Sequence, residues 1–363
     1  MKDSAHRYLK FYTTLLLFLV LSFVILYQAR ILLIPLSFAL LISFLYYPLC
    51  VWIEKRSNRM TAIAGCLILL FVAGILVFKL FSNSLSLLQE EFSGSKEKIL
   101  AMGETILQYL GDAFAISPEQ QKLMMAQFYE NLLHETLPIA RQTISLSANS
   151  LAMLLIIPIF VSLVLYYREL LVKFALLMVP DRQIEGFKAT IREMTTTYFQ
   201  FAKGMALVYL IVGILNSLGF YLIGLPNAVY FGVLASLLTF FPYIGIMVGG
   251  AAAVIVAWTT YDSLWYPLGV VAVLSVVQYL EANVIFPIAV GRQLKINTLA
   301  TLIAIFIGGI VWGAAGMILF VPFAALLKIL ADKVEGLQPL GVLLGLDPRQ
   351  NMGVKKWFGK KAG

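Results

Sequence analysis

Residues 278–295 read Gln-Tyr-Leu-Glu-Ala-Asn-Val-Ile-Phe-Pro-Ile-Ala-Val-Gly-Arg-Gln-Leu-Lys, and they end an apolar run that is long enough to cross a membrane. Glu281 lies inside that run. Because a carboxylate in the hydrocarbon core of a bilayer is costly, such a residue is rarely placed there without a function. The stretch therefore predicts a membrane-spanning helix that carries a functional acid.

The composition of the whole chain places this helix in a polytopic membrane protein. The chain has 363 residues, of which 61% are hydrophobic and 13% charged, with a mean hydropathy of +0.89. Soluble domains carry about 25% charged residues. The apolar runs are long and continuous, unlike the alternating segments of roughly ten residues in membrane β-barrels. We predict an all-α, polytopic fold in the lipid bilayer, and we assign the net charge of +8 to cytoplasmic loops rather than to nucleic-acid binding.

The order of apolar and polar runs divides the chain into five regions. Spans near 11–27, 31–53 and 61–81 are each long enough to cross a bilayer. A fourth span near 151–167 precedes a charged segment, and a fifth covers 204–223. The predicted regions are N-terminal transmembrane helices in 1–82, an acidic helical extracytoplasmic domain in 83–147, a transmembrane helix plus an amphipathic helix in 148–203, a transport core in 204–330, and a basic cytoplasmic tail in 331–363.

The amphipathic helix has one narrow apolar stripe. Ile184, Phe187, Ile191, Met194, Tyr198 and Phe201 are spaced alternately by three and four residues among Lys and Arg. Such a stripe either lies along the membrane interface or packs on a neighbouring helix. The spacing leaves both alternatives open.

The charge distribution predicts the orientation. Lys and Arg concentrate in 1–10, 54–60 and 168–203, whereas acids outnumber bases in 83–147. Because cytoplasmic loops carry an excess of Lys and Arg, we expect the N- and C-termini to be cytoplasmic and 83–147 to be outside.

Two apolar stretches are too long for one membrane-spanning helix and too short for two full ones. Residues 228–260 are interrupted by Phe-Pro-Tyr-Ile-Gly at 241–245, and residues 296–327 are interrupted by Gly308, Gly309 and Gly313. With the charges on their flanks, they predict two interrupted, re-entrant hairpins that enter from opposite faces, as in secondary transporters. The alternative is that each stretch is a pair of short tilted helices packed closely through glycine.

Ordered landmarks in the chain resemble the autoinducer-2 exporter (AI-2E) family of bacterial transporters. They are Tyr167-Arg168-Glu169, Pro180, Phe-Pro-Tyr-Ile-Gly at 241–245, Gln278, Glu281, Asn283, Pro287, Gly291, Gly308-Gly309, Gly313, Gly316, Pro322 and Lys328, with Ile34-Pro35-Leu36 and Tyr47-Pro48-Leu49 earlier. The chain departs from the family pattern at Met205, where relatives often have glutamine, and at Asn297-Thr298, which replace a histidine–proline pair. No landmark falls in 83–147.

The resemblance implies a multi-pass carrier of the bacterial inner membrane. Family members are described as exporters of autoinducer-2 and some as sodium/proton antiporters. The expected partners are therefore a small polar solute, sodium or a proton, and further copies of the chain in a ring-shaped homo-oligomer, with a pentamer as one option.

The candidate pathway residues surround Glu281 and the two hairpin breaks. Gln278 is three residues before Glu281 and shares its helix face, whereas Asn283 points elsewhere unless the helix breaks before Pro287. Glu281 either takes part in coupling to a cation or solute or is a hydrogen-bonded packing anchor, and Arg292 or Lys295 could pair with it across a break. The full set of pathway candidates is Glu281, Gln278, Asn283, Pro242, Tyr243, Gly245, Pro287, Gly291, Gly308, Gly309 and Gly313.

Motifs exclude several function classes. There is no phosphate-binding loop that ends in Gly-Lys-Ser or Gly-Lys-Thr, no His-Glu-x-x-His and no Gly-x-Ser-x-Gly, so we predict no enzyme activity, cofactor or metal site. The leading hypothesis is a secondary transporter that exports a small polar, autoinducer-2-like solute with an ion gradient. The alternatives are a sodium(lithium)/proton antiporter and a non-transporting membrane scaffold.

Overall fold

The structure is a computed structural model that describes residues 2–94, 117–130, 148–239, 244–261, 263–290, 293–334 and 336–346. Within these residues the chain is helical, apart from loops, turns and one isolated β-bridge between Ile296 and Gly345. Five described helices are long and apolar enough to cross a membrane, or six if a bent pair counts as one span. The predicted polytopic helical membrane fold is confirmed.

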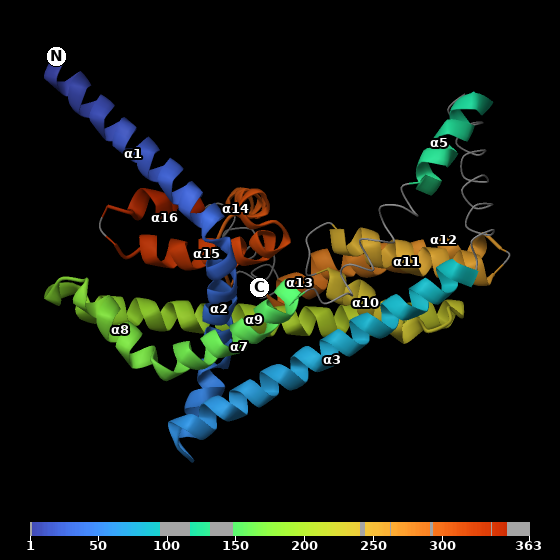
Figure 1. The fold of residues 1–363 in the computed structure, drawn as a ribbon, viewed down its shortest axis with the longest axis horizontal. Helices are drawn as coiled ribbons and strands as arrows, with labels where there is room; N and C mark the ends of the chain where they lie inside the picture. The colour runs from blue at the N-terminus through green and yellow to red at the C-terminus, as the bar shows by residue number, and fades with distance from the viewer. Residues whose placement is uncertain are drawn as a thin grey trace, which may run out of the picture. The chain divides into compact units, whose positions relative to one another are not determined.

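The first half of the chain contains the long helices α1, α2 and α3, the short insertion helix α5, and the consecutive helices α7 and α8. Their bounds are α1 Lys2–Gln28, α2 Arg30–Glu54, α3 Arg59–Gly94, α5 Pro118–Glu130, α7 Ala148–Tyr166 and α8 Arg168–Leu177 (Figure 1). Helix α5 begins where the sequence contains Ser117-Pro118, and the Gln120 backbone N–H donates to the Ser117 hydroxyl at 3.3 Å. Ser117 therefore caps α5, and Pro118 occupies the first helical position, where its missing N–H costs no hydrogen bond.

The second half runs from a 3₁₀ turn, η2, to the short C-terminal helix α16. Its elements are η2 Asp181–Gln183, α9 Ile184–Ile223, α10 Ala228–Leu238, α11 Ile244–Thr260, α12 Trp265–Leu280, the π turn η3 Glu281–Ile285, α13 Phe286–Ala289, α14 Thr298–Trp312, α15 Ala314–Ala331 and α16 Gln338–Leu344. Packing divides the chain into two compact units. Unit 1 is drawn from Met1–Leu67, Leu155–Ala202 and Arg292–Gly363, and unit 2 from Ile68–Leu154 and Lys203–Gly291.

In unit 1 the stretch predicted as the second hairpin folds into α14 and α15, which pack against each other and reverse direction at Gly313. Gly313 has φ +60°, a conformation that side chains with a Cβ rarely adopt. Gly308 and Gly316 face each other, and a Cβ on Gly308 would lie 2.2 Å from the Gly316 carbonyl oxygen. The backbones of α14 and α15 therefore approach each other closely at glycine residues. This matches the alternative in which the stretch is a pair of short helices packed through glycine.

Asn297 connects the start of this hairpin to the C-terminal segment through side-chain hydrogen bonds. Its Oδ1 accepts the Ala300 backbone N–H at 2.7 Å, which caps α14. Its Nδ2 donates to the carbonyl oxygens of Leu343 and Gly345 at 2.7 and 2.8 Å. The segment after 331 is thus not simply a basic tail, because α16 packs on α15 and is bonded to Asn297.

Replacing Asn297 with alanine should lower the free energy of unfolding by about 2–3 kcal/mol. The variant loses a helix cap, worth about 1 kcal/mol, and leaves two carbonyls without this donor. Asn58→Ala is the matched control, because the Asn58 side chain caps α3 through one bond to the Thr61 N–H at 2.9 Å and makes no second hydrogen bond to the described residues. Thermal unfolding in detergent measures both variants. Equal losses would show that the bonds to α16 contribute nothing.

In unit 2 the stretch predicted as the first hairpin folds into α10 and α11, and α11 also packs against α12 (Figure 1). The turn of the hairpin, residues 240–243, lies outside the described residues. Gly249 of α11 packs on Ala235 of α10, where a Cβ would lie 2.7 Å from the Ala235 Cα. Both predicted stretches are therefore interrupted pairs of short helices, and neither is one continuous helix.

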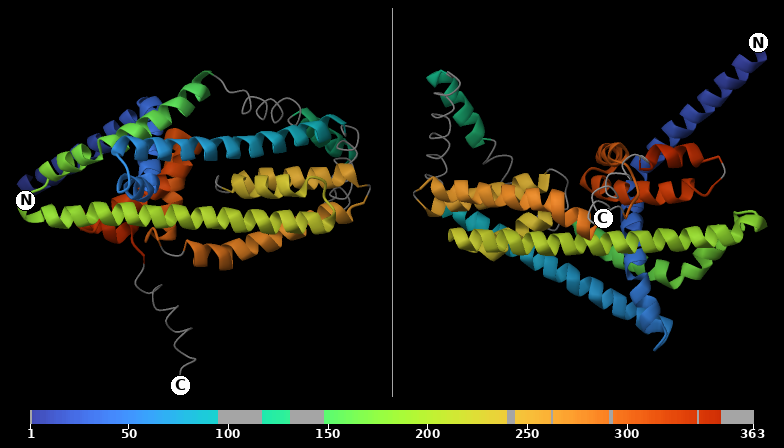
Figure 2. Two further views of the ribbon diagram at one scale, coloured as in Figure 1. Left: turned by 90° about the horizontal axis from the view of Figure 1, so that it is seen from below. Right: turned by 180° about the vertical axis from the view of Figure 1, so that it is seen from behind.

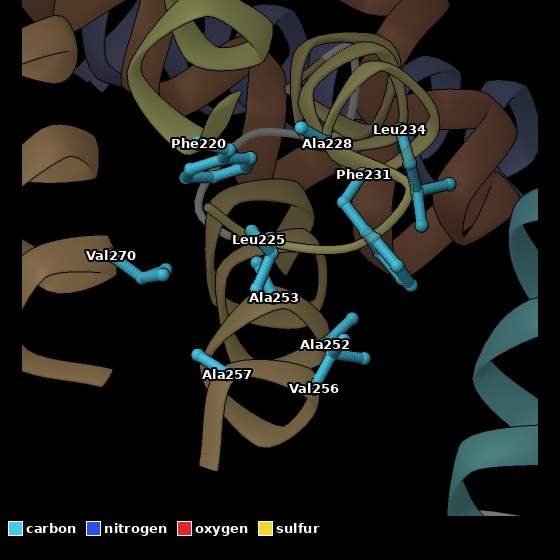
Figure 3. Close-up of a cluster of buried hydrophobic side chains, with 10 residues drawn as sticks. All are labelled: Phe220, Leu225, Ala228, Phe231, Leu234, Ala252, Ala253, Val256, Ala257 and Val270. Atoms are coloured by element: carbon cyan, nitrogen blue, oxygen red, sulfur yellow. The ribbon is translucent and has the colours of Figure 1, made fainter. Parts of the chain in front are cut away.

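The core of unit 2 combines a few large side chains with many small ones. Figure 3 shows Phe220 and Phe231 with alanines from α10 and α11. Small residues let helix backbones approach closely, which replaces the missing hydrophobic drive between helices in a lipid environment. The buried members of the cluster are Phe220, Leu225, Ala228, Phe231, Leu234, Ala252, Ala253, Val256, Ala257 and Val270.

Two predicted region boundaries lie inside continuous helices, although one of them, 203/204, agrees within one residue with the division between the two units. The boundary at 203/204 lies inside α9, one unbroken helix that joins the amphipathic segment to the fifth span (Figure 2). The boundary at 82/83 lies inside α3, which continues to Gly94. In both cases polarity changes without a proline or another residue that would end a helix. The region 204–330 is divided between the two units, so it is not one compact core. Most of 83–147, and residues 347–363, lie outside the described residues.

Candidate functional site

The candidate site in unit 2 is a small polar cavity that contains Glu281. Leu274, Val277, Gln278 and Glu281 line it from one side. They are spaced by three, one and three residues, so they occupy one face of the helix formed by α12 and the start of η3. Gln278 and Glu281 therefore share a face, as predicted from their spacing.

Helices α9 and α10 supply the opposite walls. Val212 and Asn216 come from α9, whose buried positions 208, 212, 216 and 220 form its inner face. Ala235 and Thr239 come from α10, one turn apart. A hydrogen bond of 2.6 Å from the Ser236 hydroxyl to the Tyr209 carbonyl fixes α10 on α9 beside the cavity. The cavity is thus held by three packed helices, and all of its lining residues belong to unit 2.

Two buried oxygens in this cavity have no hydrogen-bond partner among the described residues. They are Oε2 of Glu281 and Oδ1 of Asn216, whose residues are 8% and 4% exposed. The Thr239 hydroxyl donates to the Ala235 carbonyl at 2.9 Å, which leaves its lone pairs available as acceptors. Within the described part of the chain no Lys, Arg or His lines the cavity. The lining therefore offers acceptor oxygens without a protein cation to balance the carboxylate.

The cavity is small. Its volume is about 10 Å³, close to what a single water molecule requires. A proton carried by Glu281, one water or one dehydrated monovalent cation matches this size. A solute of several heavy atoms does not.

The helix around Glu281 is irregular, and Pro287 explains why. Proline has no N–H, and its ring clashes with the carbonyl one turn earlier. The segment Glu281–Ile285 is a π turn, in which the Phe286 N–H bonds the Glu281 carbonyl instead of the carbonyl four residues back. Such turns inside α-helices are frequent at functional sites.

Asn283 and Pro287 do not line the cavity. Both are exposed, and the Asn283 side chain donates to the Tyr279 carbonyl of its own helix at 2.9 Å. Asn283 thus satisfies a backbone group near the π turn. Gly245 lies in the first turn of α11, whereas Pro242, Tyr243 and Gly291 lie outside the described residues.

One predicted charge partner of Glu281 pairs with another acid in unit 1. Lys295 belongs to unit 1 and pairs with Glu193 on α9 at 3.2 Å. Its positive φ of 53° places it in a tight turn before α14. Pairing of Glu281 with Lys295 or Arg292 stays a prediction, because Lys295 and Glu281 belong to different units and Arg292 lies outside the described residues.

The glycines of the second hairpin have a packing explanation. Gly308 meets Gly316, and Gly309 faces the Met317 side chain at 3.3 Å from a hypothetical Cβ. Gly313 is exposed at the turn between α14 and α15. All three belong to unit 1, whereas Glu281 and Gln278 belong to unit 2.

Two cavity residues were missed by the sequence interpretation. Asn216 lies in the predicted span 204–223 and is its single amide side chain. A lone amide in an apolar span is the same kind of signal as Glu281 and could have been used. Thr239 carries no such signal, because hydroxyl residues are common in membrane helices and bond their own backbone.

Comparison with known proteins gives a consistent result. Residues 16–336 match the profile described as "AI-2E family transporter". The chain is 25% identical to YueF over 315 residues, 81% of this chain and 82% of that protein. It is 31% identical to YrrI over 162 residues, 45% of each protein. Both come from Bacillus subtilis (strain 168), and both are named "Putative transport protein". The "AI-2 transport protein TqsA" of Escherichia coli (strain K12) is 24% identical over 320 residues, 86% of this chain and 88% of that protein.

Proposed function

Because this chain belongs to the AI-2E transporter family, we propose that it is a secondary transporter that exports a small polar, autoinducer-2-like solute with an ion gradient. It is a multi-pass membrane protein of a family of transport proteins. The proposed solute class is supported by the name of TqsA, which is similar over most of its length. The names of YueF and YrrI give no substrate.

The observation that carries the proposal is the uncompensated carboxyl group of Glu281. A buried carboxylate needs a proton, a cation or hydrogen-bond donors to offset its lost hydration. Here one oxygen has no partner among the described residues, and the neighbouring Asn216 oxygen has none either. A packing anchor would be expected to have its hydrogen bonds satisfied within the protein. Glu281 therefore suits a group that exchanges a proton or cation during transport.

The size of the cavity supports a coupling ion, rather than the solute, as its occupant. About 10 Å³ admits a water or a bare ion, so the solute would need a wider path than this conformation offers. In an alternating-access cycle the protein exchanges between inward-open and outward-open states. The ion can bind at one site and the solute at another, and both binding events then shift this one equilibrium. We therefore place ion coupling at Glu281 and Asn216, and we leave the solute path to another part of the core.

A sodium(lithium)/proton antiporter is the second candidate function. It is favoured by the same cavity, because a carboxylate, amide oxygens and a hydroxyl are hard oxygen donors that suit a small cation. Proton and sodium would then compete for Glu281. A non-transporting scaffold would require neither the acid nor the unpartnered amide.

Transport into and out of proteoliposomes tests these functions against one another. Purified protein is reconstituted, a pH or sodium gradient is imposed, and labelled autoinducer-2 and labelled sodium are followed in separate experiments beside protein-free vesicles. Gradient-dependent solute movement supports the carrier. Sodium movement that requires an opposing proton gradient but no solute identifies an antiporter. If both solute and ions leak only as in protein-free vesicles, the transporter proposal is wrong.

The orientation follows the charge distribution. We propose an inner-membrane protein with both termini in the cytoplasm and residues 83–147 outside, because Lys and Arg concentrate in 1–10, 54–60 and 168–203. We also propose a homo-oligomer, for which a pentameric ring is one option suggested by the family resemblance.

A further inference from the structure

Helix α8 has an apolar face that no other part of the described chain covers. None of its residues is buried. Its outward apolar side chains recur at helical spacing and occupy one arc of roughly 120°. Val172, Ala175 and Leu176, on the other side, are half-buried against the protein. The outward side chains are Leu170, Leu171, Phe174 and Leu177, followed by Met178, with exposures of 60%, 46%, 63%, 77% and 73%.

The start of α8 is held at a fixed corner. Helix α7 ends at Tyr166, and α8 turns away from it by 65° (Figure 1). Arg168 forms an ion pair with Glu54 at the end of α2, and Glu169 pairs with Arg59 at the start of α3 at 3.4 Å. All four residues belong to unit 1. Two ion pairs therefore tie the corner to the α2–α3 turn.

This attachment fixes where α8 begins relative to the membrane. The turn joins two membrane-spanning helices and carries Glu54, Lys55, Arg56 and Arg59. Charged turns of this kind cannot lie in hydrocarbon, so the turn lies at a membrane face. The first turn of α8 lies at the same face, because it is bonded to both ends of that turn.

The neighbouring side chains are those of a membrane interface. Tyr166 and Tyr167 are exposed at the corner, with ring centroids 4.9 Å apart. Exposed tyrosines are enriched at the level of the lipid headgroups. Lys173 borders the apolar arc and is exposed, so its ammonium group can reach water while its stem follows the apolar surface.

We propose that α8 is an interfacial helix that lies in the headgroup boundary of the surrounding bilayer. Its partner is a lipid surface: the arc from Leu170 to Met178 contacts acyl chains, and Glu169 and Lys173 remain at the aqueous side. The strong turn away from α7 keeps a ten-residue helix, about 15 Å long, near the face at which it starts. This role is independent of which solute or ion the protein carries.

Depth-dependent quenching by lipids tests the proposal on the full-length protein. An environment-sensitive fluorophore is attached at Phe174→Cys, or at Leu177→Cys if the first variant does not fold. Cys50 and Cys66 are buried, so the unmodified protein provides the labelling background. Vesicles contain phosphatidylcholine brominated near the headgroup or near the chain end, and iodide serves as the aqueous quencher. Lys173→Cys is the polar control on the same helix, and the exposed Leu155→Cys on α7 marks the deep position.

The expected result is that shallow bromines quench the label at position 174 at least about twofold more than deep bromines, as for interfacial helices. Position 155 should show the reverse order, and position 173 should respond more to iodide than position 174. Quenching of position 174 by iodide alone would place the arc in water. Preferential quenching by deep bromines would make α8 part of a broken span, and shielding from all quenchers would indicate cover by a second copy of the chain. Each of these three results overturns the proposal.

Discussion

Replacing Glu281 with glutamine is expected to abolish gradient-driven transport in proteoliposomes. Glutamine retains the size and hydrogen-bonding reach of glutamate but cannot release a proton or supply a charge to a cation. If Glu281 couples the ion, flux should fall to the level of protein-free vesicles. Because the carboxyl group has no ion-pair partner among the described residues, its loss leaves no described cation unpaired. Expression and the midpoint of thermal unfolding should stay close to those of the unmodified protein.

Glu185→Gln is the matched control, since Glu185 is an exposed acid on α9 that pairs with Lys188 one turn away. It removes a carboxylate of the same kind outside the cavity, and surface pairs of this sort contribute about 0–1 kcal/mol. Normal transport by Glu281→Gln, with the control also normal, would make Glu281 a packing anchor. Loss of transport in both variants would point to a general effect of charge rather than to the cavity.

Replacing Gly308 with alanine is expected to destabilise the α14–α15 hairpin by about 3 kcal/mol or more, at the upper end of overpacking effects. The added Cβ would lie 2.2 Å from the Gly316 carbonyl oxygen and 2.5 Å from its carbonyl carbon. Both are backbone atoms, so the clash can be relieved only by separating the helices. We expect a lower unfolding midpoint and a smaller monodisperse fraction in size-exclusion chromatography.

The adjacent Gly309→Ala provides a control with the same chemistry in the same helix. Its Cβ would meet the flexible Met317 side chain at 3.3 Å rather than backbone, so the expected loss is below about 1 kcal/mol. Alanine has the higher helix propensity, so propensity alone would stabilise both variants. Comparable damage from the two variants would mean that the close approach to the Gly316 backbone is not what makes glycine necessary at position 308.

The sequence predicted the class of fold because membrane helices follow from the length and continuity of apolar runs. Span 31–53 corresponds to α2 within one residue at each end, and both interrupted stretches fold into helix pairs. Region boundaries were drawn where polarity changes, and such a change need not end a helix. At Lys203-Gly204 and after Phe81 the polarity changes but the backbone remains helical.

The candidate site was predicted only along one helix. The spacing of Gln278 and Glu281 placed them on one face, which needs no knowledge of other helices. Asn216 and Thr239 lie 65 and 42 positions earlier, and only packing of α9 and α10 against α12 brings them to Glu281. Likewise, the pairing of Lys295 with Glu193 depends on the tertiary arrangement of unit 1, which periodicity does not encode.

The π turn at 281–285 has a consequence for the periodicity of the buried face. Val277, Glu281 and Ile285 are all buried although they are spaced by four residues. In a regular α-helix, eight residues rotate about the axis by roughly 80° beyond two full turns, so Ile285 would leave the face that Val277 occupies. The wider turn compensates for this drift and keeps the three side chains in line. The proline that disrupts the ladder of hydrogen bonds thus extends one buried row by a full turn, with the carboxyl group at its centre.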